Sequence, residues 1–294
     1  MKIVVLGATG MLGHRLLISL SALGHEVVGT VRGVPAAMPK AITQAGARLI
    51  GDVTIERDGR IEQVLDEVRP DVVLNCIGVV KQLSSAKDPL IAIPVNAMFP
   101  HQLADACAKR RVRMIHFSSD CVFSAQGGPY SEASWPDPRD LYGRSKLLGE
   151  VNTPNALTLR SSIIGHELGA GSGLIAWVLR NRGRRVSGYA RAFYTGVTTD
   201  FMSRAVHRLL TDFPELCGVW HLSADPISKY DLVRLVDETY GLGLTIDRDE
   251  SFVCDRRLDS TPLRDRTGIV PPPWRQMVEE MHASYDRDGE SYGR

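Results

Sequence analysis

The stretch MKIVVLGATGMLGHRLLISLSALGHEVVGT, residues 1–30, decides the fold. A short apolar run at Lys2–Leu6 leads into a glycine-rich turn, a helical pattern over Met11–Leu23 follows, and a second apolar run occupies Glu26–Thr30. Short runs rich in Val and Ile are typical of buried parallel strands. Strand, helix and strand in this order predict a βαβ unit, in which the crossover helix makes the two strands parallel.

The same alternation continues through the first half of the chain. Further strands are expected at Arg48–Ile50, Val72–Asn75, Arg113–Ser118 and Leu157–Ser161. Further helices are expected at Ile61–Val68, Asn96–Lys109 and Arg139–Val151. This rhythm predicts an α/β protein with a Rossmann-type, doubly wound parallel sheet.

The second half alternates less regularly. Strands are expected at Arg185–Gly188 and Val219–Leu222, and helices at Leu174–Asn181, Phe201–Leu210, Ser228–Tyr240 and after the Pro-rich turn near residue 272. No linker or break in composition separates the halves. We therefore expect residues 1–161 to form the Rossmann core and residues 162–294 to form mainly a smaller C-terminal lobe, interleaved with that core.

Composition excludes several classes of protein. The 35 basic residues nearly balance the 34 acidic ones, so neither a nucleic acid nor a membrane surface is an expected partner. No run approaches the roughly 20 apolar residues of a membrane span, and the first apolar run is too short for a signal peptide. Five scattered cysteines fit neither a disulfide framework nor a metal site, and the histidines lack ligand spacing. We expect a cytoplasmic protein without a bound metal.

The first turn reads GATGMLG and has the glycine spacing GxxGxxG. Glycines here allow a tight turn, close approach of a pyrophosphate to the backbone, and close packing of helix on strand. The free N–H groups at the start of the helix favour phosphate. We expect the following residues to bind a dinucleotide: Gly7, Thr9, Gly10, Met11, Leu12 and Gly13.

The end of the second strand bears on which dinucleotide binds. An NAD site usually carries an acid there for the ribose hydroxyl, whereas this chain has Thr30 and Arg32. A guanidinium suits a 2′-phosphate, so NADP(H) is favoured over NAD(H). After the third strand, Asp52 and Val53 could meet the adenine, or Asp52 could simply stabilise a turn. After the fourth strand, the small side chains of Cys76-Ile77-Gly78 would let the cofactor pass.

Tyr142 and Lys146 form the candidate catalytic pair. In a helix the i, i+4 spacing places both side chains on one face. An ammonium near a phenol is expected to lower the pKa of the tyrosine from about 10, so that Tyr142 can exchange a proton with a carbonyl oxygen. Lys146 can also hold ribose hydroxyls of the cofactor. A third hydroxyl is expected at the end of the fifth strand, where the residues alone leave Ser118 and Ser119 equally suited.

The motifs GATGMLG, SSDCVF, YSE and YGRSKLLGE together resemble the extended short-chain dehydrogenase/reductases, and most closely the dTDP-4-dehydrorhamnose reductases. The resemblance extends to LDSTPLRDRTGIVPPPWRQMVEEM near the C-terminus. It implies that Ser119 rather than Ser118 is catalytic, with Tyr142 and Lys146. It also implies a dinucleotide-binding core that carries the catalytic helix, a substrate-binding lobe, and NADPH-dependent reduction of a 4-keto-6-deoxy nucleotide sugar in deoxysugar or polysaccharide biosynthesis.

The substrate is expected to be a nucleotide-diphosphate sugar. The residues expected to contact it are Lys81, Asn96, Ser119, Cys121, Val122 and Thr198. Asn96 matches a position that is commonly polar in the family, and a helix cap is its alternative role. The chain departs from the family over Tyr194–Thr199, where a Gly-x-Pro-Thr stretch is usual, and over Gly78–Gln82. These departures put the identity of the sugar in doubt.

Two other functions remain open. A nucleotide-sugar epimerase or dehydratase uses the same Tyr–Lys chemistry but retains bound NAD; Arg32 argues against it, as does Cys121 where dehydratases usually carry Glu. A non-catalytic, NADP-binding regulatory subunit would often lack Tyr142 or Lys146, and both are present. A homodimer is a candidate assembly.

Overall fold

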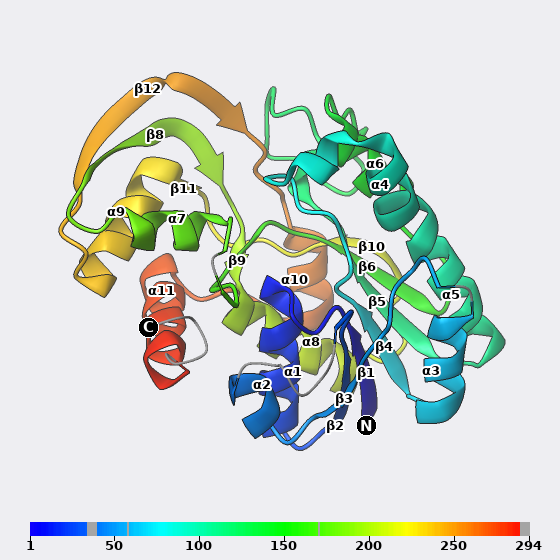
Figure 1. Cartoon of the computed structure of the whole chain (residues 1–294). Coiled ribbons are helices and arrows are strands. Elements are labelled where there is room, and N and C mark those ends of the chain that lie inside the picture. The colour runs from blue at the N-terminus through cyan, green and yellow to red at the C-terminus, as the bar shows by residue number, and fades with distance from the viewer. Residues whose placement is uncertain (34–39, 58, 170, 289–294) are drawn as a thin grey trace.

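The computed structural model describes residues 1–33, 40–57, 59–169 and 171–288. Its centre is a sheet of seven strands, with all neighbouring strands parallel (Figure 1). In spatial order the strands are β10 (Gly218–His221), β6 (Ala156–Arg160), β5 (Arg113–Phe117), β4 (Val72–Asn75), β1 (Lys2–Leu6), β2 (Glu26–Thr30) and β3 (Arg48–Ile50). The order reverses between β1 and β4, as in a doubly wound sheet, and the predicted fold class is confirmed.

Helices cover both faces of this sheet. Ile3 and Val5 pack into one buried cluster and Val4 and Leu6 into the other, because successive side chains of a strand point to opposite faces. The first cluster receives α1 (Met11–Ala22), α8 (Thr199–Thr211) and α11 (Trp274–Arg287). The second receives α3 (Arg60–Val68) and α5 (Phe99–Lys109). Burial on both faces explains why these strands read as continuous apolar runs.

The register aligns the carboxyl ends of the central strands. Leu6 pairs with Asn75 across β1 and β4, and Asn75 pairs with His116 across β4 and β5. The glycine-rich turn, the segment after β4 and the serines after β5 therefore emerge at one edge of the sheet. This is the edge at which open α/β sheets bind their ligands.

A second, three-stranded sheet forms the lobe above this edge (Figure 1). It comprises β11 (Ile227–Ser228), β8 (Arg185–Tyr194) and β12 (Thr245–Asp255), and α9 (Lys229–Tyr240) packs against the buried face of β8. The predicted strand at 185–188 is thus the first part of a longer one, and β12 was not predicted. Its sequence TIDRDESFVCD is charged and largely exposed, because β12 is an edge strand held by backbone pairing with β8.

Several short elements complete the chain. They are α2 (Lys40–Gln44), η2 (Ser84–Lys87), α4 (Pro89–Ala92), the π-helical turn η3 (Ile93–Met98), η4 (Asp120–Val122), α6 (Leu141–Leu148), β7 (Ile163–Ile164), α7 (Leu174–Arg180), β9 (Val197–Thr198) and α10 (Thr261–Thr267). The helix expected to begin at Asn96 begins earlier, since α4, η3 and α5 follow one another without a break.

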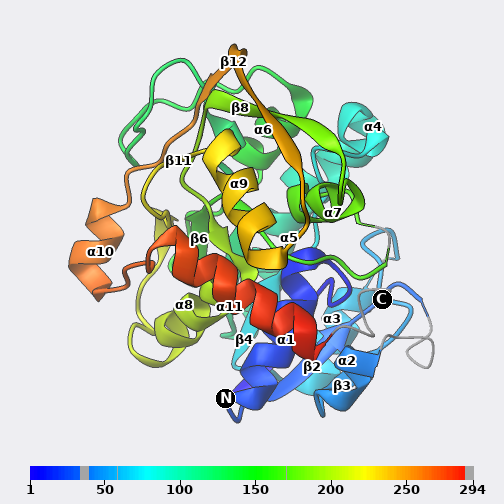
Figure 2. The ribbon, with the colours of Figure 1, turned by 90° about the vertical axis from the view of Figure 1, so that its left-hand side faces the viewer.

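The two halves of the chain are joined by a buried ionic cluster. Figure 2 shows α11 lying across α1 and α8. The guanidinium of Arg15 on α1 forms an ion pair with Asp200 on α8, at 2.8 Å, and with Asp288 after α11, at 2.9 Å. Ser284 of α11 accepts from Arg15 and donates to Asp200. The helix that follows the glycine-rich turn is thereby fixed to the C-terminal helix.

We predict that Gly13→Ala destabilises the protein. A Cβ at this position would lie 2.1 Å from the carbonyl oxygen of Gly7, so the start of α1 would have to move away from the turn. Alanine favours a helix interior by up to about 1 kcal/mol, but overpacking of this kind costs about 1–3 kcal/mol and outweighs that gain. Urea denaturation should show a lower free energy of unfolding.

Gly33→Ala is the matched control, because a Cβ there meets open space. Its free energy of unfolding should stay within about 0.5 kcal/mol of the wild-type value. Equal midpoints of unfolding for the wild type and Gly13→Ala would contradict the proposed role of this contact.

Candidate active site

The glycine-rich turn presents a free helix N-terminus. Gly10 is the N-terminal cap of α1 and is exposed, and no side chain caps the helix. The first hydrogen bond within the helix runs from the N–H of His14 to the carbonyl oxygen of Gly10. The N–H groups of the three residues before His14 therefore have no acceptor within the helix. Leu12 and Gly13 are buried and Thr9 is exposed. This geometry fits a pyrophosphate.

The residues after β2 and β3 divide into structural and exposed positions. Thr30 is buried, and its hydroxyl accepts from the N–H of Gly7 at 3.4 Å, so it holds the turn. Arg32 is exposed and forms no ion pair within the described residues. Val53 is buried, whereas Asp52 has φ of 55° and its carboxylate pairs with Arg57. These observations favour a turn-stabilising role for Asp52; its contact with adenine stays a prediction.

The segment after β4 is held by side chains beneath it. The amide of Asn75 lies 3.1 Å from a ring nitrogen of His116, and its oxygen accepts from the N–H of Ile77. Cys76 is half-buried, and burial raises the pKa of its thiol above the usual range. The segment lies beside the glycine-rich turn, because a Cβ on Gly7 would be 3.1 Å from the carbonyl oxygen of Cys76.

Helix α6 carries Tyr142 and Lys146 to this edge. A Cβ on Gly143 would lie 2.3 Å from the carbonyl oxygen of Cys121, so this glycine lets α6 pack directly on η4. Asp140 caps the helix by accepting from the N–H of Gly143 at 2.8 Å. The helix and the i, i+4 pair on it therefore agree with the sequence pattern.

The electrostatics of the pair differ from the expectation. Burial raises the pKa of Tyr142 above its ordinary value of 10, and the neighbouring Ser119 hydroxyl opposes this shift by hydrogen bonding. The expected lowering of the tyrosine pKa is therefore wrong for this structure. Burial lowers the pKa of Lys146 to about 8, and its ammonium donates to the carbonyl oxygen of Phe117 at 2.7 Å.

The structure separates the two serines after β5. The hydroxyl of Ser118 donates to the carboxylate of Glu150 at 2.6 Å, and Glu150 also receives two bonds from Arg160. Ser119 instead caps η4 by accepting from the N–H of Cys121 and acts on Tyr142. Ser119 is therefore the hydroxyl that faces the phenol.

Asn96 has a joining role rather than a capping one. It is buried inside the π-helical turn η3, and its side-chain oxygen accepts from the N–H of Val79 at 2.9 Å. Its amide group donates to the hydroxyl of Ser145 on α6 at 3.2 Å. The helix-cap alternative is wrong, because helical residues precede Asn96. A π-helical turn at such a place often marks a functional site.

Lys81 and Cys121 lie beside the catalytic helix. The ammonium of Lys81 pairs with Asp140, the cap of α6, at 2.7 Å, and lies 3.9 Å from the sulfur of Cys121. Burial raises the pKa of Cys121 to about 12, so its thiol is neutral at physiological pH. Lys81 is half-buried and can meet a substrate from the side of η4.

The side chains of two residues expected to contact the substrate are buried and engaged within the protein. The side chain of Val122 is fully buried in a small cluster with Phe123 and Leu258. Thr198 is also fully buried, and its hydroxyl caps α8 by accepting from the N–H of Phe201. Their contact with a substrate stays a prediction.

Three residues of the lobe lie close to η4, and sequence reasoning missed two of them, Lys229 and Tyr194. Lys229 begins α9, Tyr194 ends β8 and Arg256 follows β12. Electrostatic interaction with Asp120 and Cys121 affects the pKa of all three. Only the tertiary fold brings these distant segments to the catalytic hydroxyl, and a basic residue next to a helix cap carries no signal of its own.

Within the described residues, no group of three or more histidine, cysteine, aspartate or glutamate side chains is placed to hold a metal ion. In the same part of the chain, none of the helices combines the length and apolar character needed to cross a membrane.

Two solved structures share the fold of this chain. The dTDP-4-dehydrorhamnose reductase of Bacillus anthracis, in complex with NADP, matches with a TM-score of 0.79 at 18% identity, over 96% of this chain and 98% of that one. The Bordetella bronchiseptica enzyme WbmG, in complex with NAD, matches with a TM-score of 0.79 at 20% identity, over 99% and 96%. These likenesses show the fold.

Sequence comparison goes further. The dTDP-4-dehydrorhamnose reductase of Salmonella typhimurium is 24% identical over 96% of this chain and 97% of its own length. The probable low-salt glycan biosynthesis reductase Agl14 of Haloferax volcanii is 35% identical, but the match spans 59% of this chain and 57% of that protein. The model of the RmlD substrate binding domain matches residues 1–287. The chain therefore belongs to the RmlD substrate binding domain family, within the extended short-chain dehydrogenase/reductases.

Proposed function

We propose that this protein uses NADPH to reduce the 4-keto group of a 4-keto-6-deoxy nucleotide sugar, as a dTDP-4-dehydrorhamnose reductase-like enzyme. The observation that carries the proposal is the grouping of Ser119, Tyr142 and Lys146 at the edge of the sheet where the glycine-rich turn opens. Residues 1–161 then bind the dinucleotide, and residues 162–294 mainly bind the sugar nucleotide.

The turn and the strand ends would hold the cofactor. The start of α1 would receive the pyrophosphate, and Cys76 to Gly78 would line its path. Arg32 is exposed and free of a carboxylate partner in the described part of the chain, which suits a 2′-phosphate. A bound nicotinamide supplies the hydride that reduces the carbonyl carbon.

Residues of the chain itself would donate the proton that the reduction requires. Because its pKa is raised, Tyr142 stays protonated at neutral pH, and this is the form that can give a proton to the new alkoxide. Ser119 can donate to the carbonyl oxygen and orient the phenol. Lys146 remains mostly charged at neutral pH and stabilises the phenolate left behind.

The first experiment measures loss of NADPH absorbance with dTDP-4-keto-6-deoxyglucose generated in situ, with the UDP and GDP analogues and with NADH in parallel. Turnover with NADPH would support the reductase and identify the nucleotide. A changed sugar without consumption of cofactor would point to an epimerase or dehydratase. Cofactor binding without any change in sugar would point to a regulatory subunit.

We predict that Tyr142→Phe lowers kcat at least about a hundredfold, because a positioned acid contributes this much or more. The phenyl ring keeps the packing of α6, so the Kd for NADPH, measured by fluorescence, should change less than about threefold. Turnover near that of the wild type would refute the proton-donor role of Tyr142.

We predict that Arg32→Ala raises the KM for NADPH by about tenfold or more, since a charge-assisted hydrogen bond contributes about 1.5–3 kcal/mol. The KM for NADH should change less than about threefold, because NADH lacks the 2′-phosphate. The comparison of the two cofactors is the control, and equal rises in both KM values would contradict a phosphate contact.

We predict that kcat/KM for reduction falls above about pH 8. The pKa of Lys146 is lowered to about 8, so the ammonium is charged below this pH and progressively lost above it. In Lys146→Arg the side chain stays charged, and the residual activity should show no fall until well above pH 8. A fall that persists unchanged in this variant would assign the titration to another group.

A further inference from the structure

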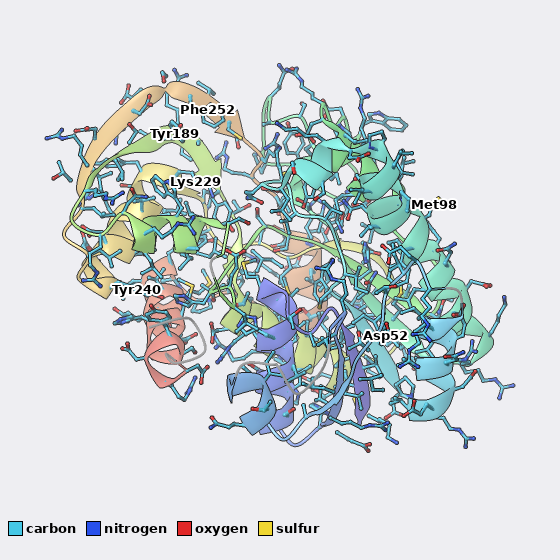
Figure 3. The ribbon with its side chains drawn as sticks, viewed as in Figure 1. Asp52, Met98, Tyr189, Lys229, Tyr240 and Phe252 are labelled. Atoms are coloured by element: carbon cyan, nitrogen blue, oxygen red, sulfur yellow. The ribbon has the colours of Figure 1, made fainter. Side chains whose placement is uncertain are left out.

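The ammonium of Lys229 is a cation without an acceptor. Figure 3 shows Lys229 at the start of α9, beneath the strands β8 and β12. Its nitrogen lies 3.7 Å from the centre of the Tyr194 ring, a cation–π contact. In the described ranges it has no ion pair or hydrogen bond, although burial lowers its pKa to about 8. A half-buried ammonium that gives no hydrogen bond to the described part of the protein has three donors for a ligand.

The phenol beside it is also incompletely bonded. Tyr194 is 5% exposed, and its oxygen is buried without a hydrogen-bond partner among the described residues. The side chain of Ser162 lies nearby but outside hydrogen-bond geometry. Buried tyrosine hydroxyls are usually hydrogen-bonded, because an unpaired buried hydroxyl destabilises the protein. Two unsatisfied polar groups therefore lie side by side.

This pair faces the catalytic hydroxyl. Asp120 and Cys121 are electrostatic neighbours of both Lys229 and Tyr194. Asp120 is adjacent to Ser119 and accepts from its hydroxyl at 3.2 Å. A ligand bound to Lys229 would thus lie near η4, the segment that Ser119 caps.

The charges around η4 favour an anion. Arg256 also acts on Asp120 and Cys121, and its Nε donates to the carbonyl oxygen of Phe123 at 2.9 Å. Three basic side chains lie near η4, namely Lys81, Lys229 and Arg256. Their neighbours include two carboxylates, Asp120 and Asp140, so this group of five side chains carries one positive charge in excess. Burial raises the pKa of the neighbouring Cys121 thiol to about 12, so this group carries no charge that would remove the excess at neutral pH.

We propose that Lys229 and the hydroxyl of Tyr194 bind an anionic oxygen of the substrate and so determine which nucleotide sugar is reduced. The proposal rests on the reductase function above and adds a specificity site to it. The anionic oxygen belongs to the diphosphate or to an acidic group on the sugar ring. In either case the ammonium binds the charge and the phenol donates the second hydrogen bond.

The test compares Lys229→Met, which keeps the length of the stem, with Lys229→Arg, which keeps the charge. In Lys229→Met the KM for the nucleotide sugar should rise about tenfold or more, kcat should stay within about threefold, and the Kd for NADPH should not change. Lys229→Arg should recover much of the affinity. Tyr194→Phe, which removes a single hydroxyl, should raise KM about threefold to tenfold.

Lys87→Met is the control for loss of one positive charge, because Lys87 is exposed in η2 and belongs to no part of the site. Its KM values should equal those of the wild type. An unchanged KM in correctly folded Lys229→Met, shown by circular dichroism, would overturn the proposal. So would a fall in kcat with KM unchanged, since that pattern belongs to a structural role.

Calorimetry with dTDP, UDP and GDP alone distinguishes the two sources of the anion. If the Kd of a nucleoside diphosphate rises in Lys229→Met as much as KM does, the ammonium binds the diphosphate. If only the complete nucleotide sugar is affected, it binds the sugar. This measurement does not depend on turnover. If the wild type binds a nucleoside diphosphate through Lys229 but reduces no 4-keto sugar, the reductase function is refuted and the binding site is not. Absence of any binding and any turnover would overturn both.

Discussion

The contact between Gly13 and the carbonyl of Gly7 is the constraint on which the site depends. It places the start of α1 directly on the turn after β1, with no room for even one methyl group between them. The free N–H groups of the helix then point over the edge of the sheet, where the aligned register also delivers the segments after β4 and β5. Looser packing would separate the phosphate-binding end of α1 from the catalytic residues.

A second set of contacts transmits this alignment to the catalytic helix. Asn96 binds the backbone after β4 and the side chain of Ser145 on α6, so one buried amide joins the cofactor side to the catalytic side. Gly143 brings α6 onto η4, which carries Ser119 at its start. Contacts of the backbone and of a buried amide group therefore determine the position of Tyr142. Such contacts hold a side chain more rigidly than contacts with exposed, mobile side chains would.

Sequence patterns predicted the core well because its strands are buried on both faces and its motifs are local. The bounds of β1 to β4 agree with the apolar runs, and the turn and the Tyr–Lys pair are each contained in one short segment. The same reasoning failed where structure depends on distant partners. Strand β12 is charged and pairs along most of its length with the distant strand β8, and the hydroxyl of Thr198 is occupied in capping a helix.

This difference explains why the reaction class is easier to infer than the substrate. The proposed proton transfer uses groups that follow one strand and one helix. The proposed anion site instead combines residues from the end of β8 and the start of α9, with Arg256 after β12 nearby. Those segments are far apart in the sequence, and their polar groups come together only in the folded protein. Lys229 illustrates the point: in sequence it follows a serine cap, and in the structure it is a half-buried cation close to η4. Substrate choice can therefore change through single residues of the lobe while the catalytic edge remains unaltered.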